Sequence, residues 1–253
     1  MKKNRPAVVI ANWKMNPQSI AEAKKILGEI KNTAQKHPSV LVMVAPPAIF
    51  LTELNRMAGE AVALGVQNIH FEPLGAFTGE ISPTMAVNSG AKFILVGHSE
   101  RRAKGESNEE VAKKVLASLK VKLTPVVCVG ERERDERGDF FLFIETQIEL
   151  AFKDLPKTRL KDIIIAYEPI WAIGIGINAT VEDIKEMQLF ILKILTKHFG
   201  RSVASQVRII YGGSVKADNA TKLYQSGGID GFLVGGASLN PAEFSAIIAS
   251  AAV

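Results

Sequence analysis

The chain has 253 residues, a net charge of +5 and one cysteine. This length allows a large buried core, while a single cysteine excludes a disulfide framework and multi-cysteine zinc or iron–sulfur sites and suits a reducing compartment. Apolar residues at 47% and charged residues at 23% are ordinary globular usage and exclude a disordered chain.

The distribution of charged and apolar residues limits the partners and the cellular location that we expect. Basic residues do not cluster into a stripe with interleaved aromatics, so nucleic acid is not expected. The densest charged run, residues 131–139, mixes both signs and reads as a solvated loop or helix face. No apolar run approaches the roughly 18–20 residues of a membrane span, and the run at 7–11 is too short for a signal peptide. We therefore expect a cytoplasmic protein.

Short apolar runs alternate with helical patterns along the whole chain. Most runs are continuously apolar, as in parallel strands covered on both faces. Strands are expected at 8–11, 40–45, 62–66, 93–96, 124–129, 163–167, 208–211 and 231–234. Helices are expected at 19–36, 109–119, 140–152, 181–199 and 216–225, with Asn16-Pro17 as a start signal and Gly200 as a stop.

Eight repeats of about 32 residues predict a (β/α)₈ barrel, an α/β fold of eight parallel strands ringed by helices. No linker or low-complexity segment interrupts it, so residues 1–253 are expected to form a single domain. The alternative is a doubly wound open sheet, which needs a glycine-rich turn after the first strand. That turn contains no glycine, and neither GxxxxGK[ST] nor GxGxxG occurs in the chain.

Polar residues and glycines follow the expected strands, at the ends that form the active face of such a barrel. They are Asn12, Lys14, His98, Ser99, Glu100, Arg101, Glu168, Gly212, Gly213, Ser214, Gly235 and Gly236. Taken singly, several of these residues could have ordinary structural roles. Asn12 could be a loop amide, Lys14 a solvated lysine and His98 a helix cap. Glu168 could be half of a surface ion pair, and the glycines could form ordinary turns. Cys128 lies inside an apolar run and reads as a buried small residue.

Taken together, these residues suit proton movement next to a carbonyl group. A carboxylate in a dry pocket can remove a C–H proton, a neutral imidazole can polarise the carbonyl oxygen, and an ammonium can stabilise the resulting negative charge. The two glycine pairs expose backbone N–H groups, and a short helix near Gly236 would add its positive end, giving a cradle for phosphate.

Five segments in order resemble the triosephosphate isomerase family. They are NWKMN at 12–16, GAFTGE at 75–80, GHSERR at 97–102, AYEPIWAIG at 166–174 and YGGSV at 211–215. The resemblance spans the chain and implies interconversion of dihydroxyacetone phosphate and D-glyceraldehyde 3-phosphate through an enediol(ate), in glycolysis and gluconeogenesis. It implies a small anionic sugar phosphate as the substrate and no cofactor or metal.

The resemblance also implies a role for each site residue. Glu168 would shuttle the proton, and His98 would be a neutral electrophile at a helix N-terminus. Lys14 would neutralise the substrate's charge, Asn12 would donate a hydrogen bond to its oxygen, and Glu100 would orient Lys14 or relay protons. Backbone N–H groups of four residues would bind the phosphate: Gly174, Ser214, Gly235 and Gly236.

A lid follows the sixth strand in this family. Here it would comprise Pro169, Ile170, Trp171, Ala172, Ile173, Gly174, Ile175 and Gly176. A closed lid excludes water and holds the reactive conformer. The family usually has Thr and Lys where this chain has Ile175 and Ile177, so we expect altered lid opening with unchanged chemistry.

Residues 67–81 form a long segment without a helical pattern, and long loops in compact domains are usually functional. The resemblance makes it the arm of a homodimer, with Phe77, Thr78 and Gly79 at its tip and Thr78 reaching the partner's 12–14 loop. The alternative is a surface loop without a partner, which would expose Phe71, Leu74 and Phe77 to water.

Two other functions stay open on the sequence alone. A barrel that binds phosphate compounds without catalysis would be expected to lack Glu168, His98 or Lys14, and the chain has all three. A Schiff-base aldolase would need a lysine near the end of a central strand such as the sixth, where this chain has Glu168.

Overall fold

The computed structural model describes residues 5–172 and 179–252, in which eight parallel strands close into a ring in chain order. Each strand pairs with the next, and β8 pairs with β1. The strands are β1 (Ala7–Asn12), β2 (Val40–Ala45), β3 (Ala63–Val66), β4 (Phe93–Val96), β5 (Thr124–Val129), β6 (Ile164–Tyr167), β7 (Arg208–Tyr211) and β8 (Gly231–Val234). The predicted (β/α)₈ barrel and all eight predicted strands are confirmed, with ends shifted by one residue in β1, β3 and β6.

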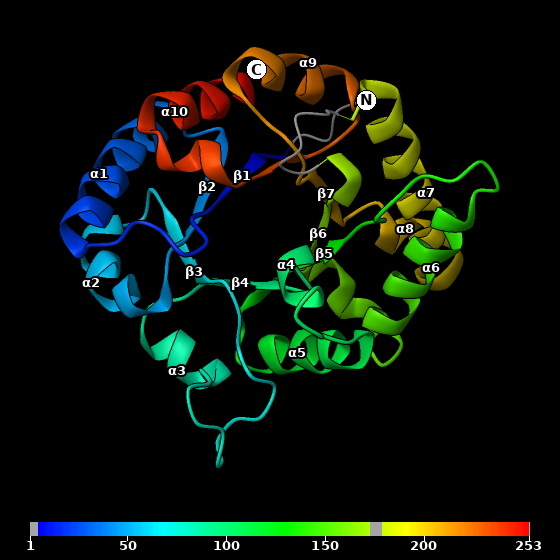
Figure 1. Cartoon of the computed structure of the whole chain (residues 1–253), viewed down its shortest axis with the longest axis horizontal. Coiled ribbons are helices and arrows are strands. Elements are labelled where there is room, and N and C mark those ends of the chain that lie inside the picture. The colour runs from blue at the N-terminus through cyan, green and yellow to red at the C-terminus, as the bar shows by residue number, and fades with distance from the viewer. Residues whose placement is uncertain (1–4, 173–178, 253) are drawn as a thin grey trace.

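Helices form an outer ring around the strands (Figure 1). They are α1 (Ile20–Lys36), α2 (Ala48–Ala58), α3 (Pro83–Asn88), α4 (Ser99–Arg102), α5 (Asn108–Lys120), α6 (Asp139–Phe152), α7 (Val181–Phe199), α8 (Arg201–Ala204), α9 (Ala217–Ser226) and α10 (Pro241–Ser250), with short 3₁₀ turns η1 (Lys157–Asp162), η2 (Ile170–Ala172) and η3 (Gly236–Leu239). No helix within 5–172 or 179–252 is long and apolar enough to cross a membrane.

The strands are apolar at consecutive positions because both of their faces are buried. In β1, Val8 and Ile10 belong to the cluster inside the barrel, whereas Val9 and Ala11 pack in the layer under the helices. This alternation follows from the two-residue period of a strand. A large core on each side of the sheet therefore holds the strand ends in fixed positions around the rim.

Local capping chemistry sets the helix boundaries. The Ser19 side chain accepts a hydrogen bond from the Glu22 N–H (3.2 Å), so α1 begins at Ile20, a few residues after the Asn16-Pro17 signal. Thr180 and Asp183 form a capping box at the start of α7. Gly200, at a φ of 84°, ends that helix as predicted.

The predicted helices are present, and α2, α3, α8 and α10 are helices that the sequence did not predict. For α10 a start signal exists, because Asn240 caps the first turn and Pro241 occupies its first position. The N-cap of α2 is Pro47, which makes no side-chain hydrogen bond, although Leu51 and Leu54 form a buried stripe. A search limited to polar caps therefore misses α2.

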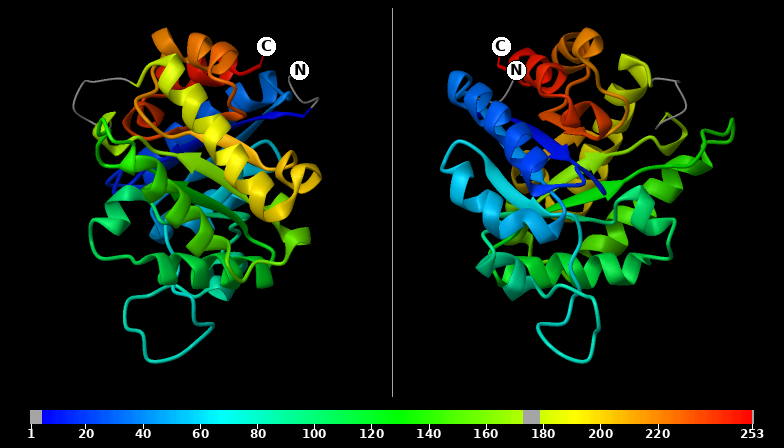
Figure 2. Two further views of the ribbon diagram at one scale, coloured as in Figure 1. Left: turned by 90° about the vertical axis from the view of Figure 1, so that its right-hand side faces the viewer. Right: turned by 60° about the vertical axis from the view of Figure 1, so that its left-hand side comes forward.

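The segment 67–81 projects from the barrel as a long loop between β3 and α3 (Figure 2). Its base is closed by a hydrogen bond from the His70 N–H to the Ile81 carbonyl (2.8 Å). The His70 ring stacks on Phe71 and on Phe77, with centroids 4.4 and 4.0 Å apart. Phe71 is thereby half-buried, in contrast to the exposure expected for a loop without a partner, while Leu74 remains 82% exposed.

Candidate active site

The carboxyl ends of parallel strands in a closed barrel meet at one rim, and the predicted site residues follow those ends. Asn12 ends β1, and β4, β6, β7 and β8 are each followed within a few residues by site residues. These are His98 after β4, Glu168 after β6, Ser214 after β7, and Gly235 and Gly236 after β8. Residues far apart in the sequence thus share one mouth of the barrel, which we call the C-terminal mouth.

Glu168 is the buried carboxylate of this mouth, with 2% of its surface exposed. Its backbone N–H donates to the Val129 carbonyl (2.8 Å), which fixes the backbone of Glu168 beside the end of β5. Its Oε2 accepts a hydrogen bond from the Ser99 N–H (3.1 Å), and its Oε1 lies 3.3 Å from His98 Nε2. The carboxylate is therefore held between the ends of β4 and β6, in little contact with water.

Neighbouring residues make room for Glu168. A Cβ at Gly130 would lie 1.7 Å from the Glu168 carbonyl oxygen, and one at Gly212 would lie 2.9 Å from its Cγ. Cys128 lies inside the barrel, where burial raises the pKa of its thiol and the charge of Glu168 raises it further. Cys128 therefore stays a neutral thiol beside the carboxylate.

His98 is the N-cap of the short helix α4, which agrees with the structural reading of the sequence. Its Nδ1 accepts a hydrogen bond from the Glu100 N–H (3.2 Å). A ring nitrogen that accepts a hydrogen bond carries no proton, so this contact places the ring hydrogen on Nε2. That Nε2 is the atom that faces Glu168.

Lys14 adopts a left-handed backbone conformation at a φ of 54°, which is uncommon for a residue with a side chain. The Asn12 Oδ1 supports this turn by accepting the Lys14 N–H (3.1 Å), and Gln67 Nε2 donates to the Lys14 carbonyl (2.8 Å). The Lys14 ammonium donates to Glu100 Oε1 at 2.6 Å. The side chain is thus directed along the rim toward the start of α4.

The ion pair with Lys14 determines the charge of Glu100. Burial raises the pKa of the Glu100 carboxyl, but the hydrogen bond and the positive charge of Lys14 outweigh it, and the net result is a lowered pKa. Glu100 is therefore ionised at neutral pH and holds the ammonium. This geometry supports an orienting contact with Lys14.

The glycines of the rim lie beside this ammonium. A Cβ at Gly235 would lie 3.4 Å from Lys14 Cε, whereas a Cβ at Gly236 would meet no atom within 4 Å. The backbone after β8 thus passes close to the lysine and borders open space. The turn η3 begins at Gly236, so the start of this turn lies close to the Lys14 side chain, an arrangement suited to an anion.

The lid residues fall into two groups. Pro169, Ile170, Trp171 and Ala172 are described, whereas Ile173, Gly174, Ile175, Gly176 and the hinge residue Ile177 lie outside the described residues. The first group starts with a one-turn 3₁₀ helix, in which the Ala172 N–H donates to the Pro169 carbonyl (2.9 Å). The predicted phosphate contact of Gly174 stays a prediction.

Glu131 anchors the start of this segment. It is 1% exposed, and its Oε1 accepts hydrogen bonds from Trp171 Nε1 (2.7 Å) and the Tyr167 hydroxyl (2.8 Å). Its carbonyl also accepts the Ile170 N–H (2.9 Å). Interpreting 131–139 as a solvated charged run was wrong for Glu131, because a mixed-sign run conceals a buried member. Its position directly after β5 and Gly130 was the signal that could have identified it.

Arg134 completes the anchor. Its Nε lies 3.2 Å from Glu131 Oε1, and its Nη1 bonds Asp183 (2.8 Å) and Glu186 (3.0 Å) on α7. Its guanidinium also lies over the Trp171 ring, 5.5 Å from the centroid. The end of β5, the start of the lid and α7 are therefore joined through one cation.

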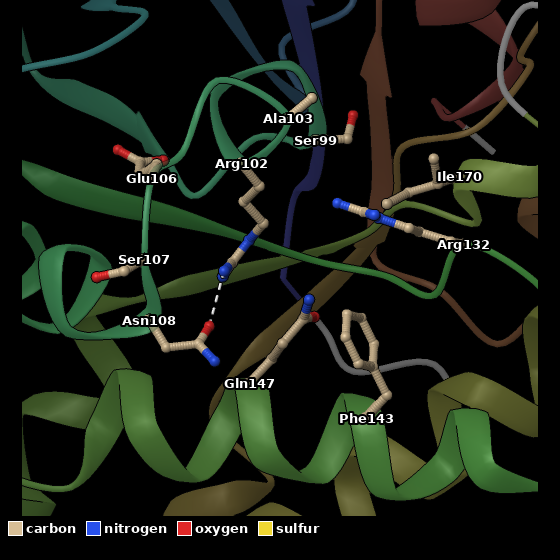
Figure 3. A pocket seen from close by; sticks show the side chains of 10 residues that line it. All are labelled: Ser99, Arg102, Ala103, Glu106, Ser107, Asn108, Arg132, Phe143, Gln147 and Ile170. Carbon is tan, nitrogen blue, oxygen red and sulfur yellow. Dashed lines mark hydrogen bonds between the residues drawn. The ribbon is translucent and has the colours of Figure 1, made fainter.

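A cavity of about 490 Å³ lies beside the site, near the start of the lid. Figure 3 shows Arg102 and Arg132 entering it from different sides, with Arg102 bonded to Asn108 at 2.7 Å. Ser99 and Ile170 line it, but His98, Glu168 and Lys14 do not. It is therefore free space next to the start of the lid, apart from these three side chains.

One group of side chains within the described ranges has the composition and spacing of a metal site. It consists of Glu145 and Glu149 on α6 and His198 on α7, all on the outside of the helical ring. The Lys197 ammonium already lies 2.8 Å from Glu145, and His198 Nε2 lies 2.9 Å from Glu149. The carboxylates are thus engaged with Lys197 and His198, away from the mouth.

Comparison with known proteins identifies the family. The family model "Triosephosphate isomerase" matches residues 7–251. A curated protein of that name from Rhodopirellula baltica is 43% identical over 251 residues, covering 98% of each chain. Another from Coprinopsis cinerea is 44% identical over 247 residues, covering 96% of this chain and 97% of that protein. Together with the closed barrel and the rim geometry, these matches show that the chain belongs to the triosephosphate isomerase family.

Proposed function

We propose that this protein interconverts dihydroxyacetone phosphate and D-glyceraldehyde 3-phosphate through an enediol(ate), as a step of glycolysis and gluconeogenesis. The single observation that carries this is the approach of a buried carboxylate to a neutral imidazole, with Glu168 Oε1 3.3 Å from His98 Nε2. A base and an electrophile at this spacing can act on adjacent atoms of one small substrate.

In this proposal Glu168 removes a proton from the carbon next to the carbonyl and returns it to the neighbouring carbon. Its burial excludes water, which favours proton transfer to carbon over transfer to solvent. The Glu168 Oε2 accepts the Ser99 N–H, so the carboxylate must exchange this hydrogen bond for contact with the substrate. Ser99 thus supplies a resting position for the base.

His98 donates its Nε2 hydrogen to the substrate's carbonyl oxygen as charge develops there. Lys14 lies on the same rim and neutralises the anionic substrate and the enediolate, with Glu100 holding the ammonium at 2.6 Å. The Asn12 Oδ1 is engaged by the Lys14 N–H, which leaves its amide nitrogen as the donor to a substrate oxygen.

The phosphate binds at the other side of the mouth, to backbone N–H groups of Ser214, Gly235, Gly236 and Gly174. The open space next to Gly236 and the closeness of Gly235 to Lys14 support this position. The phosphate does not react, so its binding energy can drive closure of the lid 169–176 over the enediolate.

We propose that the enzyme works as a homodimer of single-domain chains in the cytoplasm, without nucleic acid or membrane partners. The exposed apolar side chains on and near the projecting loop support dimer formation, since Leu74 and Met15 are 82% and 84% exposed. Phe77, Thr78 and Gly79 would enter a partner. Sedimentation that shows a fully active monomer would contradict this assembly.

The activity is tested by a coupled assay with glyceraldehyde 3-phosphate on the wild type and on Glu168→Asp. This change retracts the carboxylate by one methylene, and a misplacement of about 1 Å can lower the rate about 10²-fold. The matched control is Glu60→Asp, an exposed glutamate away from the rim, for which turnover within about twofold of wild type is expected. Normal turnover of Glu168→Asp would remove Glu168 as the base.

A further inference from the structure

The opposite end of the barrel, where the strands begin, contains a second cavity of about 450 Å³, which we call the N-terminal mouth. Lys122 lines it just before β5, Asp162 just before β6, and Arg208 at the first residue of β7. Leu41, near the start of β2, lines it from the other side of the ring. The cavity therefore spans the entrance of the barrel, at the end away from the site described above.

Positive charge dominates the lining of this cavity. Lys122, Arg159, Lys161 and Arg208 contribute four cations, and Asp162 contributes the carboxylate. That carboxylate is engaged, because Arg159 Nε lies 2.7 Å from Asp162 Oδ2. Within 5–172 and 179–252, no carboxylate forms an ion pair within 4 Å of Lys122, Lys161 or Arg208. Three cations thus face one cavity without a paired anion.

Arg208 has the least favourable surroundings of the three. Arg208 lies two residues before Ile210 on β7, so the two side chains point to the same face of the strand. Ile210 and Ile164, the partner of Arg208 on β6, both belong to the cluster inside the barrel. Its Nε is buried and makes no hydrogen bond to the described part of the chain. An Nε closed to solvent cannot contact an anion in the cavity, but Arg208 lines that cavity, so such an anion would act on the charge of its guanidinium.

The carboxylate of Asp230 also acts on the charge of Arg208, but it has other partners. Asp230 pairs with Arg5 at 3.0 Å and accepts the Ile209 N–H at 2.9 Å. Burial lowers the pKa of the Arg208 guanidinium, repulsion from Arg5 lowers it further, and Asp230 opposes these effects. Asp230 is therefore committed to Arg5 and to the backbone, and it compensates Arg208 only in part.

The backbone of Lys122 is fixed by the end of α5, which directs the chain into β5. Its φ of 64° lies in the left-handed region, and the other described residue with a side chain in that region is Lys14 of the catalytic mouth. Such conformations cost on the order of 1–3 kcal/mol and persist where the surroundings impose them. Hydrogen bonds from the Lys122 and Leu123 N–H groups to the Leu119 and Ser118 carbonyls impose it here.

We propose that the N-terminal mouth binds a small multivalent anion that carries phosphoryl groups. Guanidinium and ammonium groups are the side chains that bind phosphoryl oxygens most strongly, the guanidinium through two parallel N–H bonds. Three unpaired cations require more than one negative charge, and about 450 Å³ exceeds the volume of a single phosphate. This site is distinct from the substrate site because it lies at the other end of the barrel.

Calorimetric titration with inorganic tripolyphosphate at low ionic strength tests this proposal. The catalytic mouth also accepts anions, so the titration is repeated with saturating dihydroxyacetone phosphate, and binding that persists belongs to the second site. The test variant is Lys122→Gly with Lys161→Gln, since glycine accepts the left-handed backbone and residue 161 is exposed. The control, Lys25→Gln with Lys185→Gln, removes the same charge from exposed positions on α1 and α7.

We expect substrate-resistant binding in the wild type and in the control pair, weakened roughly tenfold or more in the test pair. Binding should also weaken as salt is added, and turnover should stay within about twofold in all variants. Tripolyphosphate binding that substrate abolishes in the wild type would overturn the proposal. Equal affinities of the test and control pairs would overturn it as well, whatever the activity of the enzyme.

Discussion

The two mouths of the barrel use similar residues in different electrostatic settings. Each has a lysine in the left-handed region, Lys14 at a φ of 54° and Lys122 at 64°. In the C-terminal mouth the ammonium has a carboxylate partner, because Lys14 bonds Glu100 at 2.6 Å. In the N-terminal mouth Arg208 has a buried Nε that donates no hydrogen bond to the described chain. A lysine in the left-handed region therefore does not by itself give a site its chemical function. The two mouths differ in the carboxylates that neighbour the lysine.

The carboxylates differ between the mouths in burial as well as in number. Glu168 and Glu131 are 2% and 1% exposed and follow β6 and β5 directly. The carboxylate of the N-terminal mouth, Asp162, is half-exposed and forms a local pair with Arg159. A buried carboxylate can act as a base in a dry site, whereas an exposed pair contributes little. One end of the barrel can catalyse, and the other can only bind.

The strongest test of this comparison replaces each left-handed lysine with glycine. Lys14→Gly keeps the backbone conformation but removes the ammonium, so we expect kcat/KM to fall on the order of 10²-fold. Lys122→Gly should leave kcat/KM within about twofold and raise the free energy of unfolding by up to about 1 kcal/mol, because strain is relieved. Kinetics and urea unfolding of both variants provide the measurements. Equal losses of activity in the two variants would remove the distinction between the mouths.

The next effect concerns the buried anchor of the C-terminal mouth. Glu131→Gln keeps the size of the side chain but removes its charge beside Arg134, Tyr167 and Trp171. Arg134 retains its bonds to α7, so we expect a loss of about 1–3 kcal/mol in urea unfolding, with a lower kcat/KM. The exposed neighbour Glu133→Gln is the control and should stay within about 0.5 kcal/mol. An unchanged Glu131→Gln would show that the anchor contributes no stability.

A smaller effect is expected from the isoleucines that stand where the family has Thr and Lys. The double change Ile175→Thr, Ile177→Lys restores the usual residues. If lid opening limits turnover, product release should change by about two- to threefold, while the rate of the chemical step stays constant. Stopped-flow measurement of product release separates the two steps. Unchanged release and turnover would dismiss the idea that these isoleucines alter the lid.

The smallest effect is the pH dependence of the Lys14–Glu100 pair. Folding lowers the pKa of Glu100 below its usual 4.5, so the pair stabilises the protein above about pH 4.5, and this contribution is lost as pH falls through the lowered pKa. More than half of the Glu100 side chain is exposed, so the effect is below about 1 kcal/mol. Unfolding of wild type and Glu100→Gln should differ at pH 7 and converge in acid. A difference that grows in acid would reverse the assigned sign.

Much of the fold could be predicted because the strands are buried on both faces and therefore read as continuous apolar runs. The active-site residues of such a barrel lie after the C-terminal ends of its strands, and this rule identified Glu168 and His98 as candidates from the sequence. It was not applied to Glu131, because the mixed charges of 131–139 suggested solvent. The helix α2 was missed because its N-cap is Pro47, which gives no polar signal. The positions of loops and surface charges are harder to predict than those of buried strands, because many arrangements of exposed residues are stable in water.

The N-terminal mouth was not anticipated for a related reason. Lys122, Lys161 and Arg208 are unremarkable in the sequence, and only closure of the ring brings them to one cavity. Arg208 is also the first residue of a predicted strand, where a charged side chain reads as an exposed end. Long-range placement of this kind needs the register of neighbouring strands, which local patterns do not supply.

Pairing of β1 with β8 has a consequence for when activity can first arise. Gly235 borders Lys14 only after the last strand has docked against the first, and Arg5 near the beginning clasps Asp230 near the end. A nascent polypeptide still attached to the ribosome by its final segment would have its base and imidazole but an incomplete anion cradle. Release of the carboxyl-terminal stretch, late in synthesis, would therefore have to complete the circle before two such chains could assemble into an active dimer.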